Sequence, residues 1–139
     1  MNSSPPPAAP PLPSAAVHER LARERNAWLC TVRPDGTPHA TPVWFVFSRG
    51  SWWVGTDASS VKVRNIERFP GVCLMLEGGD RPVVAEGEAV LYRGPFPERI
   101  TEAFTEKYAW DAVAPYEGGG ARVLLEIPVR RWLLAGTAP

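Results

Sequence analysis

Apolar and polar residues alternate along the chain in short runs that are separated by turn residues. Six runs are rich in β-branched and aromatic side chains and are bounded by glycine, proline, aspartate or serine, which is typical of β-strands. Strands this closely spaced exclude an alternating α/β sheet and favour a small antiparallel barrel that hides its own edges. Gly87 marks a bulge or a bend inside the fifth strand. The predicted strands cover residues 27–33, 39–47, 51–56, 71–77, 82–92 and 122–134.

Three other segments place apolar residues three and four positions apart, which predicts short amphipathic helices. Ser14 is a candidate N-cap for the first helix. Ser59 or Ser60 is the candidate N-cap for the second helix, and Pro70 ends it. The predicted helices cover residues 17–26, 60–69 and 97–110.

The first 16 residues are rich in proline and alanine and offer little to bury, so the sequence predicts a disordered or extended tail over residues 1–16. The rest of the 139-residue chain, residues 17–139, is of a length typical of one domain. Hydrophobic residues make up 45% of the sequence and charged residues 22%, which supports a packed core and excludes global disorder.

The charge balance and the cysteines narrow the classes of function. The 15 lysines and arginines balance the 15 aspartates and glutamates, so no global field favours nucleic acid or an anionic membrane as a partner. No apolar run reaches the roughly 18 residues of a membrane span, and the N-terminus lacks a secretory signal pattern. Cys30 and Cys73 have no CxxC spacing and no neighbouring histidine, which argues against a metal site and favours free thiols in a reducing cytoplasm.

Motifs for covalent catalysis are absent from the sequence. It holds no dinucleotide fingerprint, Walker loop, zinc-protease motif or serine-hydrolase motif, and its only histidines are His18 and His39. The protein therefore either performs no covalent catalysis or takes its chemistry from a cofactor. The catalytic residues stay unassigned, because His39, Tyr92, Tyr108 and a bound water are all candidate proton donors.

Residues 56–65 form the best candidate for an anion site. A strand ends there, a hydroxyl-bearing loop follows and a helix begins, so backbone N–H groups and the helix dipole favour a negative charge. Ser59 and Ser60 add hydroxyl donors. Lys62 and Arg64 add positive charge near the helix start, which is unfavourable for an isolated helix and is explained by a bound phosphate. The alternative is a solvated basic face on a surface helix.

The strand segment from residue 41 to 45 is a second candidate site. Pro42 removes a ladder donor from an apolar strand, which indicates a bulge or an edge where a ligand can approach the backbone. A flat aromatic ring fits against such a wall. The alternative is a core strand with an edge proline.

Trp52 and Trp53 are adjacent in the third predicted strand. One of the two side chains must face inward and the other outward, because successive residues of a strand point to opposite faces. An outward tryptophan needs a cover. We expect a subunit interface to supply it, since aromatic residues are enriched in such interfaces.

Five stretches of the sequence together resemble a known superfamily. They are DGTPHATPVWF, the Trp-rich strand, KVRNIERFPGVCLML, VVAEGEAVLY and RVLLEIPVRRW, in that order. They resemble the pyridoxamine 5′-phosphate oxidase-like FMN-binding split-barrel superfamily, and within it the F420-dependent flavin/deazaflavin oxidoreductase (class B) branch. The resemblance runs from about Ala27 to Trp132, and its most specific parts are the K-x-R-N helix start and the A-E-G-x-A strand.

The resemblance implies a six-stranded antiparallel split β-barrel of Greek-key type that pairs as a homodimer. It also implies two cofactor sites in the interface grooves, each lined by both subunits. Lys62 matches the lysine that holds the cofactor phosphate, with Arg64 and Asn65 beside it. The other implied cofactor-binding residues are Pro42, Val43 and Trp44, which face the tricyclic ring, and Thr56, Ser59 and Ser60, which line the phosphate loop.

The cofactor and the activity follow from the same resemblance. FMN-using relatives often carry Ser-Arg-Lys before the helix, whereas this chain has Ser60-Val61-Lys62. The missing arginine removes a bidentate phosphate donor, which weakens the case for FMN and leaves the choice open. The expected function is hydride transfer from reduced coenzyme F420 to an unsaturated or conjugated small-molecule acceptor. The alternatives are an FMN-dependent oxidase or reductase, a non-catalytic protein that binds a flavin or a tetrapyrrole, and a scaffold subunit whose groove is filled by Trp44 and Trp53.

Overall fold

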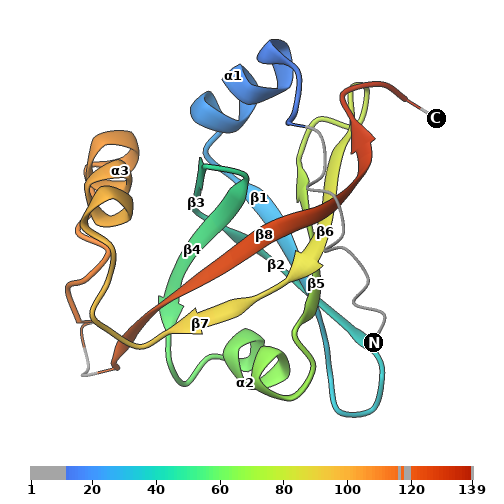
Figure 1. Cartoon of the computed structure of the whole chain (residues 1–139). Helices are drawn as coiled ribbons and strands as arrows, with labels where there is room; N and C mark the ends of the chain where they lie inside the picture. Colours follow the sequence, from blue (N-terminus) through green and yellow to red (C-terminus); the bar gives the residue numbers. More distant parts are fainter. Residues whose placement is uncertain (1–11, 116, 118–119, 139) are drawn as a thin grey trace, which may run out of the picture.

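The computed structural model describes residues 12–115, 117 and 120–138. Most of the predicted N-terminal tail lies outside the described residues, so the tail stays a prediction. Three short helices surround a strongly curled antiparallel sheet (Figure 1). The protein is therefore mostly β, as the spacing of the apolar runs predicts.

All three predicted helices are present, and two of the predicted caps are confirmed. The hydroxyl oxygen of Ser14 accepts a hydrogen bond from the N–H of Val17 at 3.2 Å, and that of Ser60 accepts one from the N–H of Val63 at 3.4 Å. Within the described residues no helix has the length and apolar character that a membrane span requires. The helices are α1 (Ala15–Arg23), α2 (Val61–Arg68) and α3 (Glu98–Tyr108).

The described part of the sheet contains eight strands where the sequence predicts six, because two of the predicted strands are each broken in two. One break is at Trp44 and the other at Ala89. The strands are β1 (Ala27–Val32), β2 (Pro38–Val43), β3 (Phe45–Ser48), β4 (Ser51–Asp57), β5 (Gly71–Leu76), β6 (Val83–Glu88), β7 (Val90–Tyr92) and β8 (Arg122–Ala135).

The chain at Trp44 connects the two ends of the curled sheet. Neighbouring strands run antiparallel in the order β2-β1-β5-β6-β8-β4-β3, and β7 pairs with β8 off this path. β2 and β3 are consecutive in the chain but lie at the two ends of this order. The chain therefore pairs with β1 before Trp44 and with β4 after it. Pro42 therefore sits in an end strand, which confirms the predicted edge position. The curled sheet is the split barrel that the resemblance implies.

The second break follows a bulge at Gly87. The register between β6 and β8 shifts at this glycine, which confirms the predicted irregularity. A Cβ atom on Gly87 would overlap the carbonyl oxygen of Pro128, so a larger residue has no room there. Past Ala89 the chain continues as β7, which pairs with the earlier half of β8.

Two apolar clusters hold the fold together. The larger lies inside the barrel and contains Trp52, and the smaller lies between the barrel wall and α3 and contains Trp53, Ile100 and Phe104. Both tryptophans are buried, at 0% and 1% exposure. The expectation that a subunit interface covers the outward tryptophan is therefore wrong, because α3 of the same chain covers Trp53.

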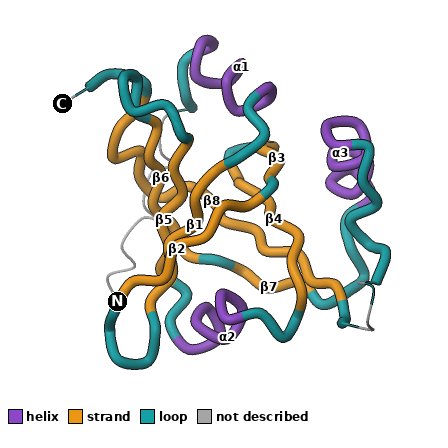
Figure 2. Tube along the Cα trace, turned by 180° about the vertical axis from the view of Figure 1, so that it is seen from behind, coloured by secondary structure: helices purple, strands orange, loops and turns teal. Residues whose placement is uncertain are grey.

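The helices cover only part of the barrel. α1 and α2 lie at opposite ends of it, and α3 lies to one side against β3 (Figures 1 and 2). The outward side chains of β1, β5 and β6 are half-buried or exposed. No described helix packs on that face, so it is one of the open surfaces of the protein.

Candidate cofactor-binding site

A cleft of about 310 Å³ opens where the end of β2 meets β4 and the first turn of α2. It collects residues that are far apart in the sequence, because the turn at Trp44 joins the two ends of the curled sheet. Gly55 and Trp110 contribute to its walls. The cleft also brings together five residues that the resemblance assigns to the cofactor: Pro42, Val43, Trp44, Thr56 and Lys62.

Among the described residues that line the cleft, Lys62 carries the one charged side chain. Its side chain is half-buried, and burial lowers its pKa because the charged form loses water. Among the described residues no carboxylate lies within 4.0 Å of its Nζ atom. A desolvated cation without an internal ion pair gains from a bound anion, so this lysine favours a negatively charged ligand.

The loop between β4 and α2 is ordered by its own side chains. The carboxylate of Asp57 accepts hydrogen bonds from the N–H and the hydroxyl of Ser59, both at 2.7 Å, and these bonds hold the pKa of Asp57 below its usual value. The hydroxyl of Thr56 lies 3.5 Å from that of Ser60, which caps α2. Thr56 and Ser60 therefore place two hydroxyls at the helix start, while Ser59 is exposed and bonded to Asp57.

Arg64 and Asn65 lie apart from the cleft walls. Arg64 is exposed on the outer side of α2. The side-chain amide of Asn65 is buried and donates a hydrogen bond to the hydroxyl of Thr31 in β1 at 3.0 Å. Asn65 thus anchors α2 to the sheet, and through the helix it fixes the position of Lys62.

Two tryptophans form an aromatic corner beside Lys62. The ring of Trp44 stacks on Tyr108 at 4.6 Å between centroids and 8° between planes, and it meets Trp110 at 5.7 Å and 88°. Trp44 is 41% exposed, and Trp53 is buried elsewhere. The scaffold alternative expects Trp44 and Trp53 to fill the groove. Instead, Trp44 lines an open cleft and Trp53 lies outside it, so this expected feature is not observed.

Sequence reasoning missed Gly55 and Trp110. A Cβ atom on Gly55 would lie 2.9 Å from the ring of Trp110, so the glycine lets that ring rest against β4. A glycine inside an aromatic strand is the available signal for such a close approach. Trp110 follows α3 and carried no signal, because only the tertiary packing of α3 brings it to the cleft.

None of the three candidate proton-donating side chains is among the described residues that line the cleft. The hydroxyl of Tyr92 donates to the carboxylate of Glu126 at 2.8 Å, which raises its pKa. The hydroxyl of Tyr108 is buried against the backbone of Phe45, behind Trp44. His39 lies on β2, and partial burial together with nearby positive charge lowers its pKa. The catalytic assignment therefore stays open.

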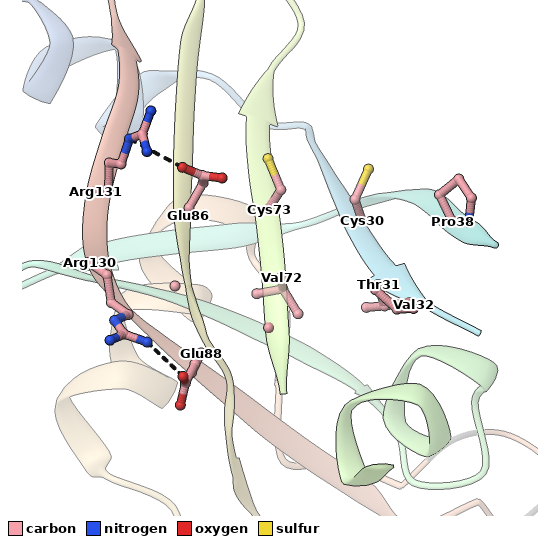
Figure 3. A pocket seen from close by; sticks show the side chains of 12 residues that line it. Cys30, Thr31, Val32, Pro38, Val72, Cys73, Glu86, Glu88, Arg130 and Arg131 are labelled. Carbon is pink, nitrogen blue, oxygen red and sulfur yellow. Dashed lines mark hydrogen bonds and ion pairs between the residues drawn. The ribbon is translucent and has the colours of Figure 1, made fainter. Parts of the chain in front are cut away.

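A larger hollow, of about 480 Å³, lies on the outer face of β1, β5, β6 and β8 (Figure 3). Its cations are paired with carboxylates: Arg130 with Glu88 at 2.7 Å and Arg131 with Glu86 at 3.5 Å. The described lining of this hollow therefore offers no uncompensated positive charge to a phosphate. No group of three or more histidine, cysteine, aspartate or glutamate side chains in the described ranges is placed to hold a metal ion.

The cleft fits a phosphate-bearing planar cofactor in three respects. It has a half-buried cation with no carboxylate partner among the described residues, the hydroxyl of Thr56 just before α2, and a corner of two indole rings next to an edge strand. Its volume is at the small end of ligand pockets, which are commonly about 300–1,000 Å³. A second wall is therefore needed to enclose a whole cofactor.

Comparison with known proteins shows the family of the chain. The pyridoxamine 5′-phosphate oxidase family model matches residues 13–135. A conserved hypothetical protein from Mycobacterium tuberculosis is 30% identical, with a TM-score of 0.69 over 87% of this chain and 84% of that one. No curated protein matches the sequence.

Two further solved structures share the fold at lower identity. One is an F420 reductase, which is 22% identical, with a TM-score of 0.69 over 86% of this chain and 97% of that one. The other is an FMN-binding protein related to pyridoxamine 5′-phosphate oxidase from Nostoc punctiforme, 16% identical, with a TM-score of 0.58 over 83% and 77%. The family match spans nearly all of the described residues, and the chain belongs to the pyridoxamine 5′-phosphate oxidase family.

Proposed function

We propose that the protein is an F420-dependent oxidoreductase that reduces an unsaturated or conjugated small molecule. The observation that carries the proposal is Lys62, a half-buried ammonium group that lines a cleft with an aromatic corner and has no carboxylate within 4.0 Å among the described residues. Phosphate-bearing redox cofactors need both features, an anion anchor and a flat wall for the ring. The likeness to an F420 reductase agrees with this choice.

Each part of the cleft has a role in this proposal. Lys62 binds the cofactor phosphate, and the hydroxyls of Thr56 and Ser60 donate to its oxygens. Pro42 and Val43 present the edge of β2 to the ring, and Trp44 walls the cleft beside it. When bound, reduced F420 supplies a hydride. The aromatic corner excludes water from the acceptor's side of the cleft.

The helix start distinguishes F420 from FMN only in part. The position before Lys62 is Val61, which is 42% exposed and donates no side-chain hydrogen bond to a phosphate. An arginine there would hold a phosphate with two parallel bonds. FMN-dependent chemistry on the same residues is the second candidate, and the likeness to an FMN-binding protein favours it.

We further propose that the working form is a homodimer. Pro42 at the cleft is paired in register with Trp28 of β1, which is 38% exposed on the open face of the sheet. A second copy that covers Trp28 would reach the mouth of the cleft and supply the missing wall. Trp28→Glu should then shift the protein towards monomer in light scattering and weaken cofactor binding. An unchanged dimer would place the interface elsewhere.

The test is a calorimetric titration of the purified protein with F420 and with FMN, side by side. We expect F420 to bind more tightly. Lys62→Ala should weaken binding by about 1.5–3 kcal/mol, the range for a lost hydrogen bond to a charged group. Arg68→Ala is the matched control, because it removes the same charge from the opposite end of α2. Equal losses in both variants would contradict the role of Lys62.

Turnover separates the remaining alternatives. A cofactor that binds at Lys62 but reduces no member of a panel of conjugated carbonyl and alkene acceptors would favour a non-catalytic carrier. Tighter binding of FMN than of F420 would favour the second candidate. Binding of neither cofactor, with a correctly folded protein, would contradict the proposed function.

A further inference from the structure

A second hollow, of about 390 Å³, lies beside β3, where α1 and α3 pack against that strand (Figure 1). We call it the β3 groove. Its floor is apolar and includes Leu21, Val46 and Phe47, and its rim carries charged side chains. Its described lining comes from α1, the link that follows α1, β3 and α3. None of these belongs to the open sheet face that the proposed homodimer covers, and none of the lining residues is shared with the cofactor cleft.

One backbone N–H at the edge of β3 has no acceptor among the described residues. β3 ends the strand order, and its antiparallel pairing with β4 leaves every second residue with its N–H and C=O pointing away from β4. Phe45 is such a residue, because its N–H donates to the hydroxyl of Tyr108 at 2.9 Å. Phe47 is the next one, and no described group accepts from its N–H. This edge therefore offers a free donor to a ligand.

The charges around the β3 groove are mostly positive. Arg23, Arg25 and Lys107 line it, against the single carboxylate of Glu106 among its described lining residues. No carboxylate of the described chain lies within 4.0 Å of either arginine. The guanidinium of Arg25 is exposed but held in place, because it donates to the carbonyl oxygen of Lys107 at 3.2 Å and lies 4.8 Å from the centre of the Tyr108 ring. The groove therefore complements an anion.

We propose that the β3 groove is a second ligand site, which binds a small carboxylate with an apolar body, such as an ionised medium-chain acid. Arg23 and Arg25 attract the carboxylate, and the N–H of Phe47 donates a hydrogen bond to it. The apolar body lies on Leu21 and Val46. The size of the groove is within the common range of ligand pockets, about 300–1,000 Å³.

The edge of β3 is too short for a peptide to be the occupant. The strand has four residues, and α3 already takes up the backbone groups of Phe45 through Tyr108 and Lys107. Only Phe47 keeps its outward N–H free, whereas a peptide added as a strand needs a row of such groups. A single donor beside two guanidinium groups suits one carboxylate.

Two pairs of variants test the recognition of charge. Replacing Arg23 and Arg25 together by glutamine should weaken octanoate binding about fivefold or more. The matched control replaces Arg68 and Arg81, two exposed arginines that do not line the groove. Glu106→Gln removes a like charge from the rim and should tighten binding about twofold. Its control is Glu102→Gln, one turn earlier in α3 and outside the groove lining.

The experiment titrates the full chain, without any cofactor, with octanoate and follows the backbone amides by ¹⁵N–¹H NMR. We expect the amide of Phe47 to shift most, and octanamide, the neutral analogue, to bind more weakly than octanoate. The proposal is overturned if the folded protein does not bind octanoate, if octanamide binds as tightly, or if the shifts centre on the cleft at Lys62. Affinities that do not differ between the Glu106 and Glu102 variants would place the carboxylate away from this rim and would overturn it too.

Discussion

The chain has only two lysines, and the regions around them differ in a way that separates structure from function. Lys62 faces the cleft, and Lys107 near the end of α3 faces the chain's own backbone. Burial lowers the pKa of both side chains. The Nζ atom of Lys107 donates to the carbonyl oxygens of Leu21 and Phe45, both at 3.0 Å, whereas no carboxylate of the described chain reaches that of Lys62.

The comparison teaches that burial alone does not mark a functional lysine. Lys107 and its neighbour Tyr108 form a clamp that joins α3 to β3, and Lys107 also holds the end of α1. The cost of burying Lys107 is offset by hydrogen bonds inside the fold. The cost of burying Lys62 has no such compensation from a described carboxylate, and a ligand anion can provide it.

The largest expected effect is on stability: a substitution in the clamp should destabilise the fold, and a substitution in the cleft should not. Tyr108→Phe removes a hydroxyl that accepts from the N–H of Phe45 at 2.9 Å and lies 2.8 Å from the carbonyl oxygen of Arg25. It should lower the free energy of unfolding by about 1–3 kcal/mol, the cost of a buried N–H left without a partner. Lys62→Met should leave it equal or higher. Urea unfolding measures both, and a larger loss in Lys62→Met would reverse the comparison.

A second substitution tests the cleft by filling it. Gly55→Val places side-chain atoms against the ring of Trp110, where a Cβ alone already comes to 2.9 Å. Overpacking should cost about 1–2 kcal/mol of stability and displace the aromatic corner. We expect cofactor binding to fall at least tenfold in a titration. Gly79→Val is the control, since no atom of the described residues lies within 4 Å of its Cβ position. Unchanged binding in Gly55→Val would remove Trp110 from the site.

The local elements of this fold could be predicted from sequence, and the breaks could not. Turn residues and periodicity place all three helices and six strand regions, because propensity and capping act over a few residues. The break at Trp44 exists because the two halves of the predicted strand pair with different strands, β2 with β1 and β3 with β4. These pairings depend on how the whole sheet curls. A local sequence pattern carries no information on such long-range strand pairing.

The candidate site divides in the same way. Lys62, Thr56 and Pro42 could be found because a helix start and an edge proline leave local signals. Trp110 reaches the cleft through the packing of α3. Asn65 neighbours the site in sequence, but its amide donates to the hydroxyl of Thr31 in β1, a long-range contact with no local signal. Its role at the cofactor stays a prediction.

The pH dependence of stability sharpens the comparison at the clamp. Burial lowers the pKa of Lys107 from its ordinary 10.5 to about 8. Between these values the unfolded chain binds more protons than the folded one, so Lys107 should make the free energy of unfolding rise with pH. A neutral amine keeps two N–H donors, so both bonds to Leu21 and Phe45 survive deprotonation.

Urea unfolding of wild type and Lys107→Met at pH 7.5 to 9.5 isolates this contribution, because Cys73 titrates equally in both proteins and burial raises the pKa of the neighbouring Tyr108 above this range. We expect the wild type to gain stability relative to the variant as pH rises. A difference that stays constant with pH would show that Lys107 titrates normally and that the clamp tolerates its charge.

The smallest expected effect asks whether the cleft binds an anion without a cofactor. Inorganic phosphate should raise the melting temperature of the wild type, because a ligand that binds only the folded state stabilises it by about 0.4 kcal/mol when its concentration equals Kd. Lys62→Met should lose this response. Sodium chloride at equal ionic strength is the control, since screening acts on both proteins alike. If phosphate stabilises the variant as much as the wild type, the anion binds elsewhere, and the lack of a carboxylate near Lys62 among the described residues has no bearing on ligand choice.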